Sequence, residues 1–391
     1  MARKKICFVV QRYGLEVNGG AELLCRQLAE RMTDRYEVHV FTSKAVDYNT
    51  WANVYPQEQE SINGVTVHRF AVEHPRRAAR FNHINAMFYA GELHPGYEED
   101  AWFEAEGPYT PALITALDAA RDTYSAFIFF TYLYYTSVYG LPVVREKAIF
   151  VPTAHDEPFL VMDRVHRVFA APRAYFYMTA DEQKLVEERF HTASIPSAIG
   201  GAGVTLPEGI DGARFREKYH LDGDYIIYVG RIDEGKNCDE MFRYWQAYKE
   251  RSPGPLKLVM MGKEMIPVPA REDLVSLGFV SDRDKFDGIA AAKFLLLPSK
   301  FESLSIVVLE AFSLKVPVLV NGACPVLKSH CTESGAGLYY TNFMEFEGAV
   351  NALLRKPDLY AALSQNGPAY VDQHYQWSVI TGKLAGLIEG I

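Results

Sequence analysis

The sequence has few cysteines, and none of them lies in a spacing that would hold a metal. There are 5 cysteines in 391 residues, an odd number with no Cys-x-x-Cys pair and no neighbouring histidine pattern. These features exclude a disulfide framework and a zinc site, and they are typical of reduced, packed thiols. We therefore expect a cytoplasmic protein.

The chain also lacks an excess of positive charge. It has 40 Lys and Arg against 49 Asp and Glu, a formal net charge of −9, and acidic and basic residues are spread evenly over the two halves. A protein that binds nucleic acid by broad phosphate neutralisation would need a basic surface instead. We therefore expect no nucleic-acid partner.

Long hydrophobic runs are missing as well. The apolar run at residues 6–10 is too short for the core of a signal peptide. Residues 123–144 carry no charge, but their tyrosines, hydroxyl side chains, glycine and proline are too polar for a membrane span. This stretch is predicted to be a buried strand followed by a helix.

Short apolar runs alternate with helical periodicity along the chain, which is long enough for two domains. Hydrophobic residues make up 49% and charged residues 23%, a balance that is typical of globular domains. In the first half we expect strands at 6–10, 36–41, 65–70, 126–130, 149–152 and 175–178, and helices at 21–32 and 182–190. Thr179 and Glu182 form a capping-box pattern before the second of these helices.

Residues 195–212 are rich in glycine and proline and predict a domain boundary. After them we expect strands at 225–229, 256–261, 294–297 and 316–320, and helices at 238–248, 283–292 and 305–314. Strands that alternate with helices predict an α/β fold with two doubly wound parallel sheets. Ligands of such sheets bind at the carboxyl ends of the strands, so we expect the site in a cleft between the halves.

A glycine-rich turn lies between the first strand and the first helix. Its adjacent Gly19 and Gly20 let the backbone approach a ligand closely, and the helix behind them offers free N–H groups to an anion. The turn does not have the Gly-x-Gly-x-x-Gly spacing of a dinucleotide fingerprint. A tight turn that needs positive φ would explain the glycines equally well.

A second loop, from Gly230 to Lys236, directly follows a predicted strand and comes close to a P-loop. A P-loop needs Ser or Thr after its lysine to hold magnesium, but this chain has Asn237, and Asp233 would place negative charge inside the phosphate cradle. What remains is the pair Arg231 and Lys236, which can neutralise a bound diphosphate. Two solvated surface cations are the alternative.

The third motif places two carboxylates eight residues apart, Glu302 in a loop after a strand and Glu310 in the following helix. Both can accept hydrogen bonds from ligand hydroxyls, while backbone N–H groups near Leu304 and Ser305 can donate to phosphate. The alternative is a carboxylate favoured by the helix dipole at Glu302 and a solvated surface residue at Glu310.

These motifs together resemble the retaining GT-B glycosyltransferases of family 4 (glycosyl transferases group 1). The resemblance covers essentially the whole chain and rests on Gly19-Gly20-Ala21-Glu22, Gly230-Arg231…Lys236 and Glu302-x7-Glu310. It implies a GT-B fold, that is, two Rossmann-like domains facing a central cleft. The acceptor-side domain would span residues 1–200 with a returning helix at 375–391, and the nucleotide-sugar donor domain would span 201–374.

The resemblance also implies roles for residues of the C-terminal domain. Arg231 and Lys236 would neutralise the donor diphosphate, Glu310 would bind the ribose hydroxyls and Glu302 the donor sugar. Gly230, Leu304 and Ser305 would complete the donor-binding set. Of these residues, Arg231, Lys236 and Glu302 would also take part in catalysis.

In the N-terminal domain, Gly19 and Gly20 would close over the donor phosphates. The position of His155, directly after a predicted strand, matches the family's histidine near the donor sugar, so it joins the expected catalytic residues. A structural histidine is the alternative. The chain departs from the family pattern at Glu302-Ser303-Leu304-Ser305, where relatives commonly have Glu-Gly-Phe-Gly, so the donor sugar and base cannot be transferred from the family.

The function implied is that of a retaining, metal-independent hexosyltransferase without cofactor, acting in cell-surface polysaccharide biosynthesis. Its donor would be a UDP-, GDP- or dTDP-sugar and its acceptor a glycan or a lipid-linked glycan. A sugar-nucleotide epimerase of the same fold and a non-catalytic nucleotide-sugar binding module are the alternatives. The two Asp-x-Asp pairs, at 222–224 and 282–284, fit a turn and a helix cap better than a metal site.

The basic segment 74–85 carries Arg76, Arg77 and Arg80 beside Phe81 and Ile84. It could bring the protein to the cytoplasmic membrane face through anionic lipid headgroups. A solvated basic loop is the alternative reading of the same residues.

Overall fold

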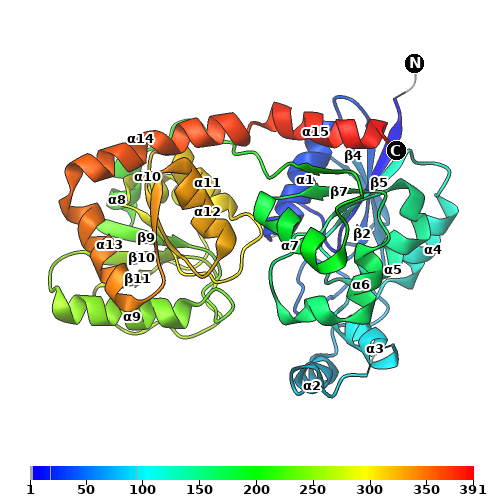
Figure 1. Ribbon diagram of the computed structural model, residues 1–391, viewed down its shortest axis with the longest axis horizontal. Coiled ribbons are helices and arrows are strands. Elements are labelled where there is room, and N and C mark those ends of the chain that lie inside the picture. Colours follow the sequence, from blue (N-terminus) through cyan, green and yellow to red (C-terminus); the bar gives the residue numbers. More distant parts are fainter. Residues whose placement is uncertain (1–2, 18, 95) are drawn as a thin grey trace. The chain divides into compact units, whose positions relative to one another are not determined.

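The computed structural model describes residues 3–17, 19–94 and 96–391. The chain divides into two compact units, Met1–Gly201 with Ser378–Ile391, and Ala202–Trp377. The sequence placed these divisions at residues 200 and 374. Figure 1 shows the elements of both units in chain order.

The described part of the first unit contains an eight-stranded sheet in the order β3-β4-β2-β1-β5-β6-β7-β8. Neighbouring strands are parallel except for the antiparallel edge pair of β3 and β4. The strands are β1 (Lys5–Val9), β2 (Glu37–Ser43), β3 (Gln59–Ile62), β4 (Val65–Phe70), β5 (Ala126–Phe130), β6 (Ala148–Val151), β7 (Ala174–Tyr177) and β8 (Ser197–Ile199).

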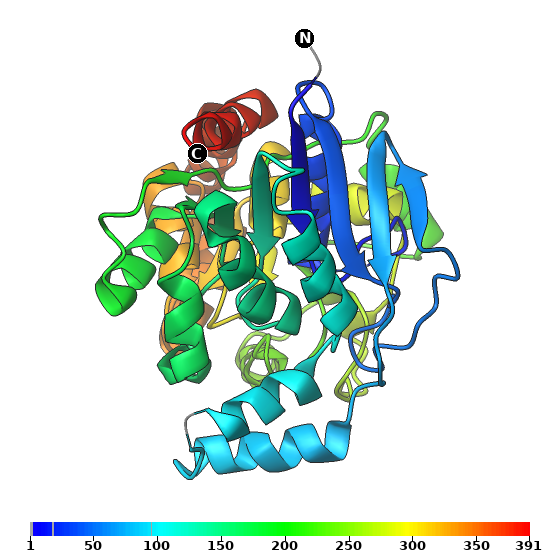
Figure 2. The ribbon, with the colours of Figure 1, turned by 90° about the vertical axis from the view of Figure 1, so that its right-hand side faces the viewer.

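Helices connect these strands and cover the sheet. They are α1 (Gly20–Met32), α2 (Ala78–Tyr89), α3 (Tyr97–Glu106), α4 (Pro111–Ala119), α5 (Tyr135–Gly140), α6 (Asp163–Phe169) and α7 (Ala180–Phe190), with 3₁₀ helices η1 (Leu141–Lys147) and η2 (Pro158–Val161). Figures 1 and 2 both show α2 and α3 beyond the carboxyl ends of the strands. The last helix, α15 (Trp377–Glu389), returns to this unit, where Lys4 Nζ lies 2.6 Å from Glu389 Oε2.

Alternate residues of the central strands point to the same face of the first sheet, because side chains in a strand alternate between faces. Phe127 and Phe129 of β5 therefore enter one core with Leu117 of α4 and Phe169 of α6. All of these side chains are fully buried. This packing fixes the carboxyl edge of the sheet, where the loops that carry His155 begin.

The second unit repeats the plan with a six-stranded, fully parallel sheet in the order β11-β10-β9-β12-β13-β14. Its strands are β9 (Tyr225–Val229), β10 (Lys257–Met261), β11 (Leu274–Ser276), β12 (Leu295–Leu297), β13 (Val318–Asn321) and β14 (Gly337–Tyr340). Numbered within the unit, this order is the 3-2-1-4-5-6 order of a Rossmann fold.

The helices of the second unit alternate with these strands. They are α8 (Gly212–Lys218), α9 (Cys238–Arg251), α10 (Asp282–Ala291), α11 (Ile306–Ser313), α12 (Pro325–Ser334), α13 (Phe343–Arg355) and α14 (Pro357–His374). The prediction of two Rossmann-like parallel-sheet domains is therefore confirmed.

No helix in the described part of the chain is long and apolar enough to cross a membrane. The uncharged stretch at 123–144 contains β5 and α5, as expected from its polarity. All five cysteines are free and buried.

Candidate functional site

The C-terminal sheet reverses its strand order between β9 and β12. These strands are neighbours in the sheet although about 65 residues separate them in the chain. Such a switch point leaves the loops after the two strands side by side, which forms the crevice where α/β sheets bind ligands. The loops that follow β9 and β12 carry the two motifs that the sequence singled out, Gly230–Lys236 and residues 298–305.

The loop after β9 is tied together by Asp233. One of its carboxylate oxygens accepts a hydrogen bond from the backbone N–H of Lys236 at 2.7 Å, and the other lies 3.4 Å from Arg231 Nε. Gly230 has φ 156°, and a Cβ there would lie 3.0 Å from the hydroxyl of Tyr228. Asp233 therefore holds both cations at one strand end, a role that its sequence position alone did not indicate.

Lys236 and Glu302 meet across the switch point. Lys236 Nζ lies 2.6 Å from Glu302 Oε1, and the side chains are 27% and 13% exposed. The structure thus brings together one predicted diphosphate ligand and one predicted sugar ligand. Each is partly open to solvent, so a ligand could exchange partners with either side chain.

Buried amides fix the ends of the strands around this pair. Asn237, in the left-handed region with φ 59°, donates through Nδ2 to the carbonyl of Pro298 at 3.1 Å and to Glu240 at 2.8 Å. Asn321, at the end of β13, donates to the same carbonyl at 3.1 Å and to Glu240 at 3.3 Å. One carbonyl and one carboxylate therefore hold the ends of β9, β12 and β13 in register, with Lys236 adjacent to the network.

Glu310 lies within α11 and is not a solvated surface residue. It is 7% exposed and its Oε1 lies 2.7 Å from Nζ of Lys285 on α10. Burial raises the pKa of Glu310, and the nearby Lys285 opposes that rise. The alternative of a surface carboxylate is therefore wrong, and the partner Lys285 was not found in the sequence.

The turn before α11 contains Leu304 and Ser305. Leu304 is buried, and its carbonyl oxygen lies 2.7 Å from Nε2 of His330. Ser305 precedes the helix with φ 68°, and its side chain makes no capping hydrogen bond. The first N–H groups of a helix have no partner within the helix, so this turn can present donors to an anion.

In the N-terminal unit, the glycine turn closes on a buried ion pair. Arg12 donates from Nε to Glu22 at 3.0 Å, and both side chains are about 6% exposed. A Cβ at Gly19 would lie 2.1 Å from Glu22 Oε2, whereas a Cβ at Gly20 would meet nothing within 4 Å. Gly19 has φ 161°, which is extended backbone. The alternative that these glycines serve a turn of positive φ is therefore wrong. A side chain at position 19 would clash with Glu22, whereas a Cβ at position 20 would meet no neighbouring atom.

His155 lies four residues after the end of β6, in a loop that a buried carboxylate supports. Its Nε2 lies 3.3 Å from Glu157 Oε2, and its side chain is 29% exposed. Glu182 accepts the backbone N–H of Ala154 at 2.6 Å and that of Met178 at 2.5 Å. Burial raises the pKa of Glu182 to about 8, although these two hydrogen bonds favour its charged form.

The helix start predicted from Thr179 and Glu182 is present at α7. Thr179 accepts the backbone N–H of Glu182 at 3.1 Å, as an N-cap should. The Glu182 carboxylate also accepts the backbone N–H groups of Ala154 and Met178, so it joins the chain after β6 to the chain after β7. The sequence signal for this glutamate was correct for the helix start and missed its longer-range role.

The basic segment 74–85 uses some of its residues within the N-terminal unit. Arg76 forms an ion pair with Glu106, and its guanidinium lies 4.6 Å from the ring centre of Phe81. Ile84 is buried, which removes it from any surface contact. Arg77 and Arg80 are exposed.

Metal-ligating side chains do not gather in the described residues: no group of three or more His, Cys, Asp or Glu there could hold a metal ion. Asp284 of the second Asp-x-Asp pair binds Lys218 Nζ at 2.8 Å and the Ser281 hydroxyl at 2.6 Å. That pair therefore lies in the first turn of α10, where the helix cap itself is Ser281.

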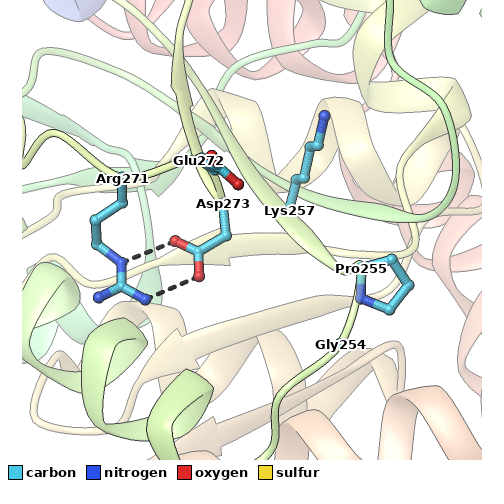
Figure 3. A pocket seen from close by; sticks show the side chains of 6 residues that line it. All are labelled: Gly254, Pro255, Lys257, Arg271, Glu272 and Asp273. Carbon is cyan, nitrogen blue, oxygen red and sulfur yellow. Dashed lines mark hydrogen bonds and ion pairs between the residues drawn. The ribbon is translucent and has the colours of Figure 1, made fainter.

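A separate cavity lies at the opposite edge of the C-terminal sheet (Figure 3). It is lined by Lys257 at the start of β10 and by Arg271, Glu272 and Asp273 just before β11. Arg271 donates two hydrogen bonds to the Asp273 carboxylate, of 2.8 and 2.9 Å. The positive and negative charges of the residues that line this cavity cancel. The cavity lies at the amino ends of the strands, away from the switch point.

The predicted residues therefore fall into three groups. Arg231, Lys236 and Glu302 are linked by contacts at the switch point through Asp233. Glu310 is linked to α10 through Lys285. His155, Gly19 and Gly20 belong to the N-terminal unit.

A known family matches the C-terminal part of the chain. The family model described as "Glycosyl transferases group 1" matches residues 211–370. Alpha-D-kanosaminyltransferase of Streptomyces kanamyceticus is 29% identical over 200 residues, which is 46% of this chain and 49% of the relative. The chain spans about half the length of the curated relatives it matches.

Solved structures resemble the chain over its whole length. HepE of Anabaena, in complex with UDP and glucose, has a TM-score of 0.73 at 14% identity and covers 100% of both chains. WaaG, a glycosyltransferase involved in lipopolysaccharide biosynthesis, has a TM-score of 0.68 at 15% identity and covers 99% of this chain and 100% of its own. Residues 211–370 thus match the glycosyl transferases group 1 domain, and the two units of the chain have the Rossmann-like fold of GT-B glycosyltransferases.

Proposed function

We propose that this protein is a retaining glycosyltransferase that moves a hexosyl group from a nucleotide-diphosphate donor to a glycan or lipid-linked acceptor. The observation that carries the proposal is the contact between Lys236 and Glu302, 2.6 Å apart at the switch point of the donor-type domain. It supports the proposal because a cation that suits phosphate lies beside a carboxylate that suits hydroxyl groups, and a sugar diphosphate requires both.

The charges around this pair suit a departing nucleoside diphosphate. When the bond to the sugar breaks, negative charge grows on the diphosphate and must be stabilised by groups already in place. Arg231 and Lys236 supply positive charge, and the start of α11 supplies backbone N–H groups. We propose that these groups act without a metal ion or cofactor.

Donor binding would replace the contact between Lys236 and Glu302 with contacts from each of them to the donor. The diphosphate competes with Glu302 for Lys236, because both are anions and the lysine is a single point charge. Release of Glu302 frees its oxygens to accept hydrogen bonds from the sugar. Glu310 would accept the ribose hydroxyls through the carboxylate oxygen that Lys285 does not occupy.

The donor to test first is UDP-glucose, because HepE, a structural neighbour, was solved with it. GDP- and dTDP-sugars complete the panel. A donor that binds only the native state raises the apparent stability, so thermal unfolding with each nucleotide sugar identifies it. We also propose a role in cell-surface polysaccharide synthesis, which WaaG, with its part in lipopolysaccharide synthesis, supports by its fold alone.

The decisive experiment measures nucleotide release with and without acceptor glycans in the wild type and in Lys236→Met. Loss of one preorganised charge should lower turnover by about 100-fold or more. Lys257→Met is the matched control, since Lys257 lies at the amino edge of the same sheet (Figure 3), and it should keep wild-type turnover.

Three results would contradict the proposal. Isomerised donor without transfer would indicate an epimerase, and binding without any turnover would indicate a binding module. Near-normal transfer in Lys236→Met would remove the role given to the cation at the switch point.

A further inference from the structure

A second concentration of positive charge lies in the N-terminal unit, on its helical surface. A cavity of about 490 Å³ opens between α5, η1 and α6. Three arginines line it, Arg145 from η1 and Arg164 and Arg167 from α6, and no carboxylate belongs to its lining among the described residues. In a chain of net charge −9, such a local excess requires its own explanation.

The three arginines differ in the hydrogen bonds and ion pairs that they form within the chain. Arg164 Nη2 binds Asp100 at 2.5 Å, but its Nε is buried without a hydrogen-bond partner. The Arg145 side chain forms an ion pair with the exposed Glu146, at 3.0 Å, and is itself 66% exposed. Arg167 is exposed and has no side-chain partner in the described part of the chain. Most of the guanidinium donors around the cavity are therefore available to a ligand.

The remaining wall of the cavity is apolar except for Tyr139, whose hydroxyl donates to Asp100. Val138 and Pro142 line one side and Ala170 and Ala171 the other. Small and apolar side chains beside three guanidinium groups suit a ligand with an anionic head and an apolar or weakly polar body. Guanidinium groups favour phosphate in particular, because their planar fork matches two phosphate oxygens.

We propose that this cavity binds the phosphate group of an organic phosphate, with Arg145, Arg164 and Arg167 as its ligands. Arg145 and Arg167, which are exposed, supply guanidinium donors and charge, and Arg164 adds a third positive charge to the wall. The ligand body lies on the wall formed by Val138 and Pro142. The site lies in the N-terminal unit and shares no residue with the proposed donor site. A failed test of one site therefore does not contradict the other.

A soluble phosphate ester and a lipid headgroup present the same chemistry. The experiment therefore uses two probes, inorganic phosphate in thermal unfolding at matched ionic strength, and flotation with phosphatidylcholine vesicles with and without phosphatidic acid. Stabilisation by inorganic phosphate supports a soluble ester as the ligand. Flotation only with phosphatidic acid supports a headgroup.

The test variant replaces both exposed arginines, Arg145→Ala with Arg167→Ala, and leaves the Arg164 contact with Asp100 intact. Loss of charge-assisted hydrogen bonds should weaken binding of the responding probe about tenfold or more. Any phosphate bound at the donor site contributes equally to both proteins. Transfer to a soluble acceptor should stay unchanged in this variant.

The matched control is Arg35→Ala with Lys184→Ala, which removes the same charge from exposed positions elsewhere in the same unit. It should bind like the wild type. Three results would overturn the proposal: no response of the wild type to either probe, unchanged binding after loss of Arg145 and Arg167, or loss of binding in the control.

Discussion

Replacing Glu182 with glutamine should change how the stability of the protein depends on pH. Glu182 is 1% exposed and its pKa is raised to about 8 from an ordinary value of 4.5, chiefly by burial. The folded state therefore keeps a proton on this group that the unfolded state has lost between those two pH values. The stability due to this proton is fully present below pH 4.5 and is lost as pH rises through 8.

The magnitude follows from the same linkage. Each unit of pKa difference is worth about 1.4 kcal/mol, so the free energy of unfolding should fall by roughly 5 kcal/mol across this window because of Glu182. Glutamine cannot titrate, so the difference between wild type and Glu182→Gln should shift steadily with pH in favour of the variant. Urea unfolding of both proteins at several pH values between 5 and 9 measures that difference.

The variant has a second, constant effect. The amide has one oxygen for the two backbone N–H groups of Ala154 and Met178, so one of them is left unsatisfied at about 1–3 kcal/mol. A difference between the two proteins that stays flat with pH, or that shifts in favour of the wild type, would refute the assignment of the raised pKa to this carboxylate.

Two further predictions compare matched substitutions. Gly19→Ala should cost about 1–3 kcal/mol of stability, because its Cβ would lie 2.1 Å from Glu22. Gly20→Ala should leave stability unchanged, because its Cβ would meet nothing within 4 Å. Equal urea denaturation midpoints for the two variants would contradict the close approach at Gly19. Lys285→Met should destabilise by about 3–5 kcal/mol by leaving the buried Glu310 carboxylate unpaired, and adding Glu310→Gln should restore most of that loss in thermal unfolding. Failure of the second substitution to restore stability would show that the charge is not the cause.

The sequence predicted those parts of the fold that depend on local pattern. β5 and β9 are unbroken apolar runs, and their bounds match the predicted strands at 126–130 and 225–229. β8 and β11 have three residues each and are only partly buried, so no run of apolar residues marks them. They are strands because of the neighbour they pair with, which is a property of the folded chain.

The site residues also divide into those that local sequence predicts and those that depend on tertiary packing. Lys236 and Glu302 could be predicted because each lies in the loop that follows a strand, and the carboxyl ends of parallel strands meet at one edge of a sheet. Lys285 could not, because its contact with Glu310 depends on the packing of α10 against α11. The partners of a buried charge are set by tertiary structure, and nothing in the spacing of these residues indicates it.

The path of the chain through its two units bears on how the protein is synthesised. The N-terminal unit is built from both ends of the chain, residues 1–201 and 378–391. Domains generally fold as units during synthesis, with the N-terminal one first. Here the first unit leaves the ribosome without the segment that buries Ile380, Leu384 and Ile388 against it. Its apolar docking surface stays open to chaperones, or to misassembly, until translation of the second unit is complete.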